Sequence, residues 1–348
     1  MRKKLTFAEA INASIEAAMK KDKKVIIIGL GVDDPKGVFG TTLNIHKRHK
    51  KNVFDMPTAE NAFTGISLGL AISNFKPIIV HQRVEFSLLS IEQIFNQIAK
   101  WYYMSGGKIN VPIVIRLIIG KGWGQGPQHS QSLEAIFSHI PGLKVVCPSN
   151  AKDAKGLLLS SISDPDPVIF FEHRWLHQTS SLVPKKNYLI PIGRAKILNK
   201  GDDITLISFS YGVIECLKSL EYLNKNKISP EIIDLRSLRP LDRKKIIKSA
   251  NKTKKVLIVD NGMIKNGISS EISAIINEEC KEKIIIKRIG VIDSPIPSSP
   301  ALAKFAYPNK NSIIRNVFNM LNLKKKIHLK NEKIIGSDQP DKYFTGPF

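Results

Sequence analysis

The chain has 348 residues, of which 43% are hydrophobic and 24% charged. This composition excludes a fibrous or disordered protein and predicts a globular one with two domains. The net charge is +23, but the basic residues are spread along the chain and only 7% of residues are aromatic. Solvated basic faces are therefore favoured and nucleic-acid binding is not expected, although binding to another polyanion stays open.

Three scattered cysteines, Cys147, Cys216 and Cys280, form neither a metal-binding spacing nor a disulfide framework. This usage suits a reducing compartment. The start, Met1-Arg-Lys-Lys4, is like the basic end of a signal peptide, but Glu9, Asn12 and Glu16 interrupt any apolar core after it, so no export signal is expected. No apolar run of about 18 residues is present, so no membrane span is expected either. We therefore expect a cytoplasmic protein.

Short aliphatic strands alternate with amphipathic helices along residues 1–180, which predicts an α/β domain with a parallel sheet. Thr6 and Glu9 have the spacing of a capping box and open a helix that reaches about residue 20. Strands are predicted at residues 24–29, 51–54, 76–81, 111–117, 143–147 and 168–172, and further helices at 61–73, 88–104 and 151–163.

Residues 181–202 are predicted to be a linker, and residues 203–323 a second doubly wound domain. Its strands are expected at 203–208, 231–235, 255–260 and 283–289, and its helices at 212–224, 242–250, 267–279 and 309–323. Asp242 is expected to be a helix N-cap. The tail, residues 324–348, has no hydrophobic periodicity, and both docking on a neighbouring subunit and disorder remain open.

Glu60 lies at the turn between the predicted strand 51–54 and the predicted helix 61–73. A carboxylate there can point into the crevice at the carboxyl edge of a parallel sheet, where open α/β proteins bind ligands. Gly65 and Gly69 thin the helix, so a ring or another backbone can approach it closely. A glutamate in the first turn also complements the helix dipole, and this structural role stays open.

Seven short motifs follow in a fixed order. They are Tyr102-Tyr-Met-Ser-Gly-Gly107, Val111-Pro-Ile-Val-Ile-Arg116, Gln128-His-Ser-Gln131, Pro141-Gly-Leu-Lys-Val-Val146, Asp153-Ala-Lys-Gly-Leu157, Ile190-Pro-Ile-Gly193 and Leu238-Arg-Pro-Leu-Asp242. With the segment around Glu60, they resemble the beta subunit of the thiamine-diphosphate-dependent 2-oxo acid dehydrogenases, which form the decarboxylating first component of the pyruvate and branched-chain complexes. The resemblance covers residues 5–323. It implies a pyrimidine-binding domain followed by a transketolase C-terminal-like domain, and an enzyme that transfers an acyl group from a 2-oxo acid to a lipoyl arm.

The resemblance implies that Glu60 hydrogen-bonds a ring nitrogen of the aminopyrimidine of thiamine diphosphate. This bond promotes the imino tautomer, in which the amino group becomes a base. Thr58 matches a position that contacts the pyrimidine. Val84 replaces an aromatic residue that is frequent in the family, and Phe86, two residues later, is the alternative ring contact. Arg83 adds a charge near this pocket, so the substrate preference can differ from pyruvate.

His129 lies in the glycine-rich loop 122–131, which follows the predicted strand 111–117. An imidazole titrates near neutrality and can pass a proton. The resemblance implies that His129 faces the active site and assists the steps in which the intermediate meets the lipoyl group. A structural role in capping the loop is the alternative.

A potassium site is also implied by the resemblance. Its oxygen ligands would come from Ile113, Ser161, Ile162, Asp164 and Asp166. Hard cations prefer oxygen, and a helix carboxyl end has free carbonyl groups with negative dipole character. Asp166 stands where asparagine is common in the family. The alternative is that residues 164–167 only form a turn before a strand.

The chain lacks the Gly-Asp-Gly motif and downstream asparagine with which the family holds Mg²⁺ and the diphosphate, because Gly201-Asp-Asp203 has no such context. The resemblance therefore implies an alpha subunit that holds both, in an α2β2 tetramer. A lipoyl acyltransferase is the other implied partner, although the net charge of +23 departs from the acidic docking patch that is usual in the family. The alternatives are half of a split transketolase or deoxyxylulose-phosphate synthase, and a non-catalytic scaffold.

Overall fold

The computed structural model describes residues 2–120, 125–323 and 327, which form two compact units. Within the described chain, the first unit contains residues 2–120 and 136–192, and the second contains residues 125–135 and 193–323. The predicted tail, residues 324–348, lies outside the described residues except for Ile327. No helix in the described part of the chain is long and apolar enough to cross a membrane.

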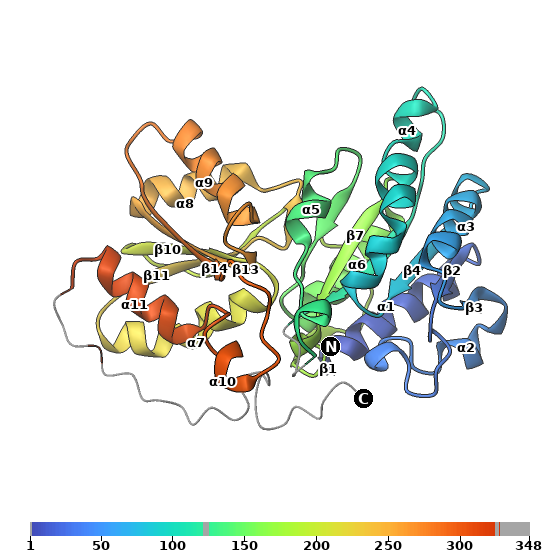
Figure 1. Cartoon of the computed structure of the whole chain (residues 1–348), viewed down its shortest axis with the longest axis horizontal. Helices are drawn as coiled ribbons and strands as arrows, with labels where there is room; N and C mark the ends of the chain where they lie inside the picture. The colour runs from blue at the N-terminus through green and yellow to red at the C-terminus, as the bar shows by residue number, and fades with distance from the viewer. Residues whose placement is uncertain (1, 121–124, 324–326, 328–348) are drawn as a thin grey trace. The chain divides into compact units, whose positions relative to one another are not determined.

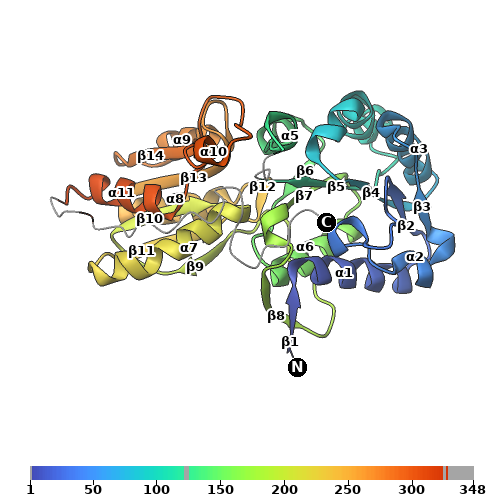
Figure 2. The same ribbon diagram turned by 60° about the horizontal axis from the view of Figure 1, so that its bottom comes forward.

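A parallel sheet with the strand order β6-β7-β5-β4-β2-β3 forms the centre of the first unit (Figures 1 and 2). Its strands are β2 (Val25–Gly29), β3 (Val53–Asp55), β4 (Lys76–His81), β5 (Val114–Ile119), β6 (Lys144–Val146) and β7 (Val168–His173). Because β3 lies on one side of β2 and the later strands lie on the other, the switch point falls between β2 and β4. β2, β5 and β7 are buried along their whole length, as is typical of a sheet covered on both faces.

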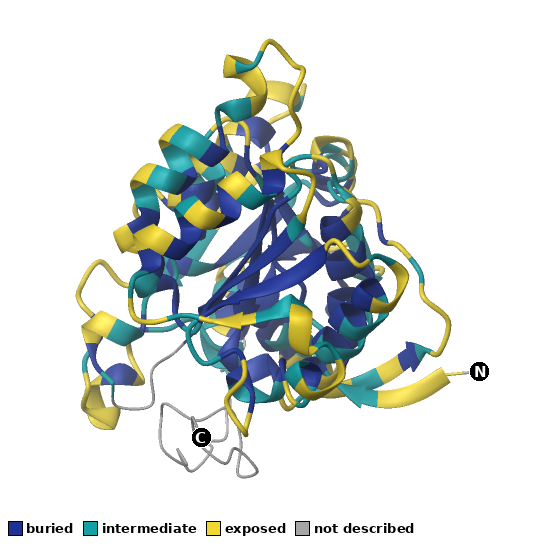
Figure 3. Cartoon of the chain, turned by 90° about the vertical axis from the view of Figure 1, so that its right-hand side faces the viewer, coloured by how far each residue is buried: buried dark blue, intermediate teal, exposed yellow. Residues whose placement is uncertain are grey.

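Helices cover both faces of this sheet. Figure 2 shows α1 (Phe7–Lys21) and α6 (Ala151–Ser163) on one face, and α3 (Glu60–Ile72) on the other. Figure 3 shows the buried strands between helices whose outer faces are exposed. The predicted capping box opens α1, since Thr6 Oγ1 accepts from Glu9 N at 3.1 Å and Glu9 Oε2 accepts from Thr6 N at 2.7 Å.

The helix predicted at residues 88–104 is irregular and begins earlier. It consists of a 3₁₀ segment at Val84–Ser90, a π turn at Gln93–Ile98 and α4 (Trp101–Met104). Hydrophobic spacing predicts a helical segment but does not distinguish turns of three, four and five residues, so this part of the prediction was wrong in detail. The remaining short elements of this part of the chain are α2 (Ile45–Arg48), α5 (Glu134–His139) and 3₁₀ turns at Val38–Gly40, Lys50–Asn52 and Arg174–Leu176.

The segment 181–202, predicted to be a linker, contains regular structure. It includes most of β8 (Ser180–Pro184), which pairs antiparallel with β1 (Arg2–Thr6), and all of β9 (Lys196–Asn199). The hydrogen-bonding partner of β8 is the start of the chain. A local pattern of residues does not reveal such a distant partner.

The second unit is a smaller doubly wound sheet with the order β14-β13-β10-β11-β9. The four predicted strands are present and parallel, as β10 (Ile204–Ser208), β11 (Pro230–Asp234), β13 (Lys255–Met263) and β14 (Ile285–Val291), whereas β9 is an additional antiparallel edge strand. Figure 1 shows α8 (Arg243–Thr253) and α9 (Ile268–Glu279) on one face, and α7 (Ser210–Lys225) and α11 (Lys310–Met320) on the other. β12 (Ser237–Arg239) and α10 (Pro300–Ala303) complete the elements.

The predicted N-cap of α8 is confirmed, because the Asp242 side chain accepts from Lys245 N at 3.2 Å. The core between α7, α11 and the sheet is aliphatic and closed by Phe318. The chain passes from β10 to β11 on one side and then to β13 on the other. The switch point of the second unit therefore lies between β10 and β13.

Candidate active site

Glu60 is the first residue of α3, five positions after the end of β3 and at the carboxyl edge of the sheet. The residue is only 4% exposed. No side chain or backbone group of the described residues hydrogen-bonds its carboxylate. Burying a carboxylate without a partner is costly, so this arrangement is typical of a site that a ligand or a second chain completes.

Hydrogen bonds join the turns that follow β2, β3 and β4 beside this glutamate. Asp55 Oδ1, at the end of β3, accepts from Val32 N at 3.0 Å. Gln82 Nε2, after β4, donates to Leu30 O at 3.0 Å in the turn after β2. These bonds join the turns on both sides of the switch point, where a doubly wound sheet binds its ligand.

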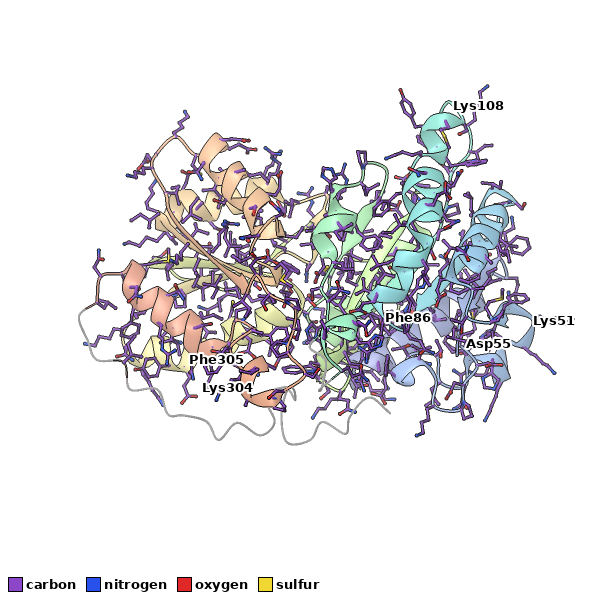
Figure 4. The ribbon with its side chains drawn as sticks, viewed as in Figure 1. Lys51, Asp55, Phe86, Lys108, Lys304 and Phe305 are labelled. Carbon is purple, nitrogen blue, oxygen red and sulfur yellow. The ribbon has the colours of Figure 1, made fainter. Side chains whose placement is uncertain are left out.

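The two other residues predicted to contact the cofactor lie on different elements. Thr58 is exposed in the turn before α3, and Phe86 is half-buried in the Val84–Ser90 segment. Figure 4 shows Phe86 and, near the end of β3, Asp55. Val84 is fully buried, and a Cβ placed on Gly69 would have no atom within 4 Å, so the surface of α3 is open there. That Thr58 and Phe86 contact a cofactor stays a prediction.

His81 is a candidate that the sequence analysis missed. It ends β4, is 2% exposed, and its ring centroid lies 5.3 Å from that of Phe63 on α3. Neither ring nitrogen has a hydrogen-bond partner among the described residues. Burial lowers the pKa of His81 to about 3, so the ring is neutral at physiological pH. Its position at the end of a central parallel strand was the available signal.

His129 ends the 3₁₀ turn Pro127–His129, is half-buried and belongs to the second unit, whereas Glu60 belongs to the first. Ser130 Oγ donates to Gly126 O at 2.6 Å and so closes the turn. Residues 122–124 of the glycine-rich loop lie outside the described residues. The role of His129 stays a prediction.

The five residues predicted to hold potassium lie at the amino edge of the first sheet, opposite Glu60. Ile113 precedes β5, Ser161 and Ile162 are in the last turn of α6, and Asp164 and Asp166 precede β7. The Ile113 carbonyl accepts from Val168 N at 2.8 Å, and the Ser161 carbonyl accepts from Asp164 N at 3.3 Å.

Both aspartates of this set are ion-paired with Lys144, the first residue of β6. Its Nζ lies 2.7 Å from an oxygen of Asp164 and 3.0 Å from one of Asp166. Within the described residues, no group of three or more histidines, cysteines or acidic residues could hold a metal ion. The structure therefore brings two of the five predicted ligands, Asp164 and Asp166, together at the ammonium group of Lys144. That the set binds potassium stays a prediction.

Residues 3–179 match the family described as transketolase, pyrimidine binding domain, and residues 193–313 match transketolase, C-terminal domain. The chain is 37% identical to the acetoin:2,6-dichlorophenolindophenol oxidoreductase subunit beta of Cupriavidus necator, over 90% of this chain and 96% of that protein. It is 38% identical to the pyruvate dehydrogenase E1 component subunit beta-1 of Arabidopsis thaliana, over 90% and 88%. It is also 38% identical to the 2-oxoisovalerate dehydrogenase subunit beta of Bacillus subtilis, over 89% and 96%.

Among solved structures, a split gene transketolase, described as an inactive beta4 tetramer, superposes with a TM-score of 0.77. The match covers 92% of this chain and 99% of the other at 20% identity. At that identity the likeness shows the fold alone. It confirms the α/β fold class with two doubly wound domains.

Proposed function

The chain belongs to the family of beta subunits of thiamine-diphosphate-dependent 2-oxo acid dehydrogenases, and from this premise we propose that it carries the catalytic glutamate of such an enzyme. The reaction is the oxidative decarboxylation of a 2-oxo acid with transfer of the acyl group to a lipoyl arm. The observation that carries the proposal is Glu60, a carboxylate buried at the start of α3 without a partner among the described residues.

The residues around Glu60 fit an aminopyrimidine ring. Thiamine diphosphate supplies the nucleophile and the electron sink that decarboxylation requires. Glu60 would hold one ring nitrogen by a hydrogen bond, a role that needs a carboxyl group not already engaged by the protein. Thr58 and Phe86 would contact the ring from the turns after β3 and β4, and His129 would move a proton when the lipoyl group arrives.

An alpha subunit is the partner that this assignment requires, because the chain has no motif for Mg²⁺ and the diphosphate. Large exposed apolar side chains on α3, which carries Glu60, and on the helical segments of residues 84–104 support such a partner. Ile66 on α3 is 49% exposed, Leu89 is 66% exposed and Tyr103 on α4 is 88% exposed. Exposed apolar residues of this kind mark interfaces. An α2β2 tetramer with Mg²⁺ bound by the alpha subunit follows as part of the proposal.

A lipoyl acyltransferase as the second partner and the cytoplasm as the location belong to the same proposal. Cys147, Cys216 and Cys280 form no disulfide with one another, which is compatible with a reducing compartment. The substrate is a 2-oxo acid of the pyruvate or branched-chain class. Identity favours neither, because the relatives named for pyruvate and 2-oxoisovalerate are both matched at 38%.

The test is CO₂ release from a panel of 2-oxo acids by this chain co-expressed with an alpha-type subunit, in thiamine diphosphate and Mg²⁺. We expect activity from the pair and none from either chain alone. Glu60→Ala should lower kcat about 100-fold or more, the loss typical of a missing proton-transfer group. Glu92→Gln, an exposed glutamate of the same unit, is the matched control and should change little.

Glu60→Gln keeps the shape of the side chain but removes the carboxyl group, so it separates the effect of the proton from the effect of the shape. Wild-type turnover by Glu60→Ala in a correctly assembled complex would refute the role of this carboxylate. A pair that binds thiamine diphosphate but acts only on sugar phosphates would instead indicate half of a split transketolase. A pair that does not bind it at all would indicate a non-catalytic scaffold.

A further inference from the structure

A buried histidine without a hydrogen-bond partner lies beside the helix that carries Glu60. His81 is the last residue of β4 and is 2% exposed. Neither its Nδ1 nor its Nε2 has a partner among the described residues. A buried polar group without a partner costs free energy, and native proteins nearly always supply one from the protein, from water or from a ligand. We therefore expect the imidazole to have a partner outside the described residues.

The imidazole of His81 is a neutral hydrogen-bonding group. Burial lowers the pKa of His81 to about 3, so at physiological pH the ring has one N–H donor and one bare nitrogen acceptor. The ring can donate to one group and accept from another, but it does not take up a proton in this range. This state fits a residue that orients a neighbour and does not fit a general acid or base.

Phe63 connects the position of His81 to that of Glu60. The ring centroids of His81 and Phe63 are 5.3 Å apart, so the imidazole packs against α3. Glu60 lies three residues before Phe63, and residues at this spacing share a face of a helix, with their Cβ atoms about 5–6 Å apart. Glu60 and Phe63 are 4% and 1% exposed. The carboxylate and the imidazole therefore belong to one buried layer between α3 and the end of β4.

Hydrogen bonds hold the wall of this layer in place. Thr64 Oγ1 donates to Ser90 Oγ at 3.2 Å and ties α3 to the helical segment after β4. Ser87 Oγ donates to Val84 O at 2.6 Å within that segment. All four of these residues are 0% exposed. Bulk water is therefore excluded from this side of the layer, and a partner of the imidazole must be small.

The carboxyl group of Glu60 needs a partner besides the cofactor. The ring nitrogen of an aminopyrimidine would engage one carboxyl oxygen, and the second oxygen would stay in a residue that is only 4% exposed. No described residue hydrogen-bonds either oxygen. A water molecule that accepts from the imidazole N–H of His81 and donates to this second oxygen satisfies both side chains at once.

We propose that His81 is a positioning residue for Glu60 and that a water molecule links the two side chains. The link holds the carboxyl group so that its other oxygen meets the ring nitrogen of the cofactor. This role rests on the proposed function, because that function assigns the cofactor to Glu60. The link itself is a property of the chain alone, so one part of the test needs neither cofactor nor substrate.

A double-variant cycle on the full-length chain, without thiamine diphosphate, tests the link. Glu60→Ala removes the carboxyl group, and His81→Phe removes both nitrogens but keeps a ring. Thermal unfolding is measured for wild type, both single variants and the double variant. Each single variant leaves the other group without its partner, so the double variant should lose less Tm than the sum of the two, by about 2–4 °C. Shifts that add within about 1 °C would overturn the proposal.

Turnover by the chain assembled with its alpha-type partner tests the effect on Glu60. His81→Phe should lower kcat about 10-fold, with little change in KM or in the Kd of thiamine diphosphate, because the carboxyl group is present but poorly oriented. His81→Asn keeps a donor and an acceptor and should recover part of the loss. An unchanged kcat for His81→Phe would refute the positioning role.

His46→Phe is the matched control. His46 lies on α2, and its Nδ1 also has no partner among the described residues. This variant should leave kcat unchanged and should give additive Tm shifts with Glu60→Ala. A non-additive cycle for His81, in a complex that turns over no 2-oxo acid, would sink the proposed function and leave the link standing. An additive cycle in an active complex would sink the link alone.

Discussion

Replacing Glu134 with glutamine should remove much of the pH dependence of stability of the second unit. Glu134 is 1% exposed at the start of α5, and Asp260, near the end of β13, is also 1% exposed. A Cβ placed on Gly262 would be 3.6 Å from Asp260 Oδ1 and 3.7 Å from Glu134 Oε2, so the two carboxyl groups are neighbours. They lie at the switch point between β10 and β13.

The proton of this pair belongs mainly to Glu134. Asp260 accepts from Gly262 N at 3.0 Å and from Ser269 N at 2.8 Å, whereas Glu134 Oε1 has no partner among the described residues. Burial, with the nearby charge of Asp260, raises the pKa of Glu134 from 4.5 to about 8. Burial also raises the pKa of Asp260, although its backbone donors and the charge of Arg288 oppose this.

The direction of the pH dependence follows from the linkage between protonation and unfolding. Because the folded-state pKa of Glu134 is raised, the stability that its proton confers is complete below about pH 4.5 and is lost as the pH rises through about 8. Each pH unit in this window changes the free energy of unfolding by about 1.4 kcal/mol, so the window of about 3.5 units amounts to roughly 5 kcal/mol. Relaxation of the site makes this an upper bound.

The assay is urea or thermal unfolding of wild type and Glu134→Gln between about pH 5.5 and about pH 8.5. We expect the difference in free energy of unfolding to move by about 3 kcal/mol in favour of the variant as the pH rises. This corresponds to a relative Tm shift of roughly 6–12 °C. Glu282→Gln removes an exposed carboxylate and should follow wild type. Parallel curves for wild type and Glu134→Gln, within about 0.5 kcal/mol, would refute the reasoning.

Two further predictions concern the first unit. Arg116→Met should lower the free energy of unfolding by about 3–5 kcal/mol, because the 0% exposed Glu172 carboxylate loses the guanidinium of Arg116, whose Nη2 lies 2.9 Å away, and keeps the His177 ring at 3.3 Å as a weaker partner. Urea unfolding measures this, and a loss below about 1 kcal/mol would contradict it. Gly29→Ala should lower the free energy of unfolding by at least about 2 kcal/mol, because its Cβ would lie 2.4 Å from Val80 O at a φ of +156°. Gly69→Ala, in open space on α3, should instead raise the free energy of unfolding by about 0.5–1 kcal/mol. Equal Tm shifts for the two glycine variants would show that the packing argument is wrong.

Elements whose ends carry a chemical marker could be predicted from the sequence. α6 begins and ends at the predicted residues because Asn150 caps it, its side chain accepting from Asp153 N at 2.9 Å, and because Pro165 follows its end. The helix after Glu60 was predicted at residues 61–73, one residue later than α3, which begins at Glu60 itself.

Pairings between distant residues could not be predicted in the same way. β8 was taken as linker because its partner, β1, lies at the other end of the first unit's sequence. Lys144 belongs to the motif of residues 141–146, but no sequence pattern predicts that it contacts Asp164, which lies 20 residues later. His81 was missed because a histidine at the end of an apolar strand cannot be distinguished from a core residue by pattern alone.

The segment 125–135 has a consequence for how the chain could be divided. It follows β5 in the sequence but belongs to the second unit, where Gly262 of β13 approaches Ser132 O and Glu134 Oε2. The units are therefore not consecutive pieces of polypeptide, because the chain leaves the first unit after Gly120 and returns at Ile136. Dividing the chain between residues 192 and 193 would separate the loop of His129 from the second unit, which it contacts at β13. Exchange of C-terminal domains between relatives would have to preserve that contact.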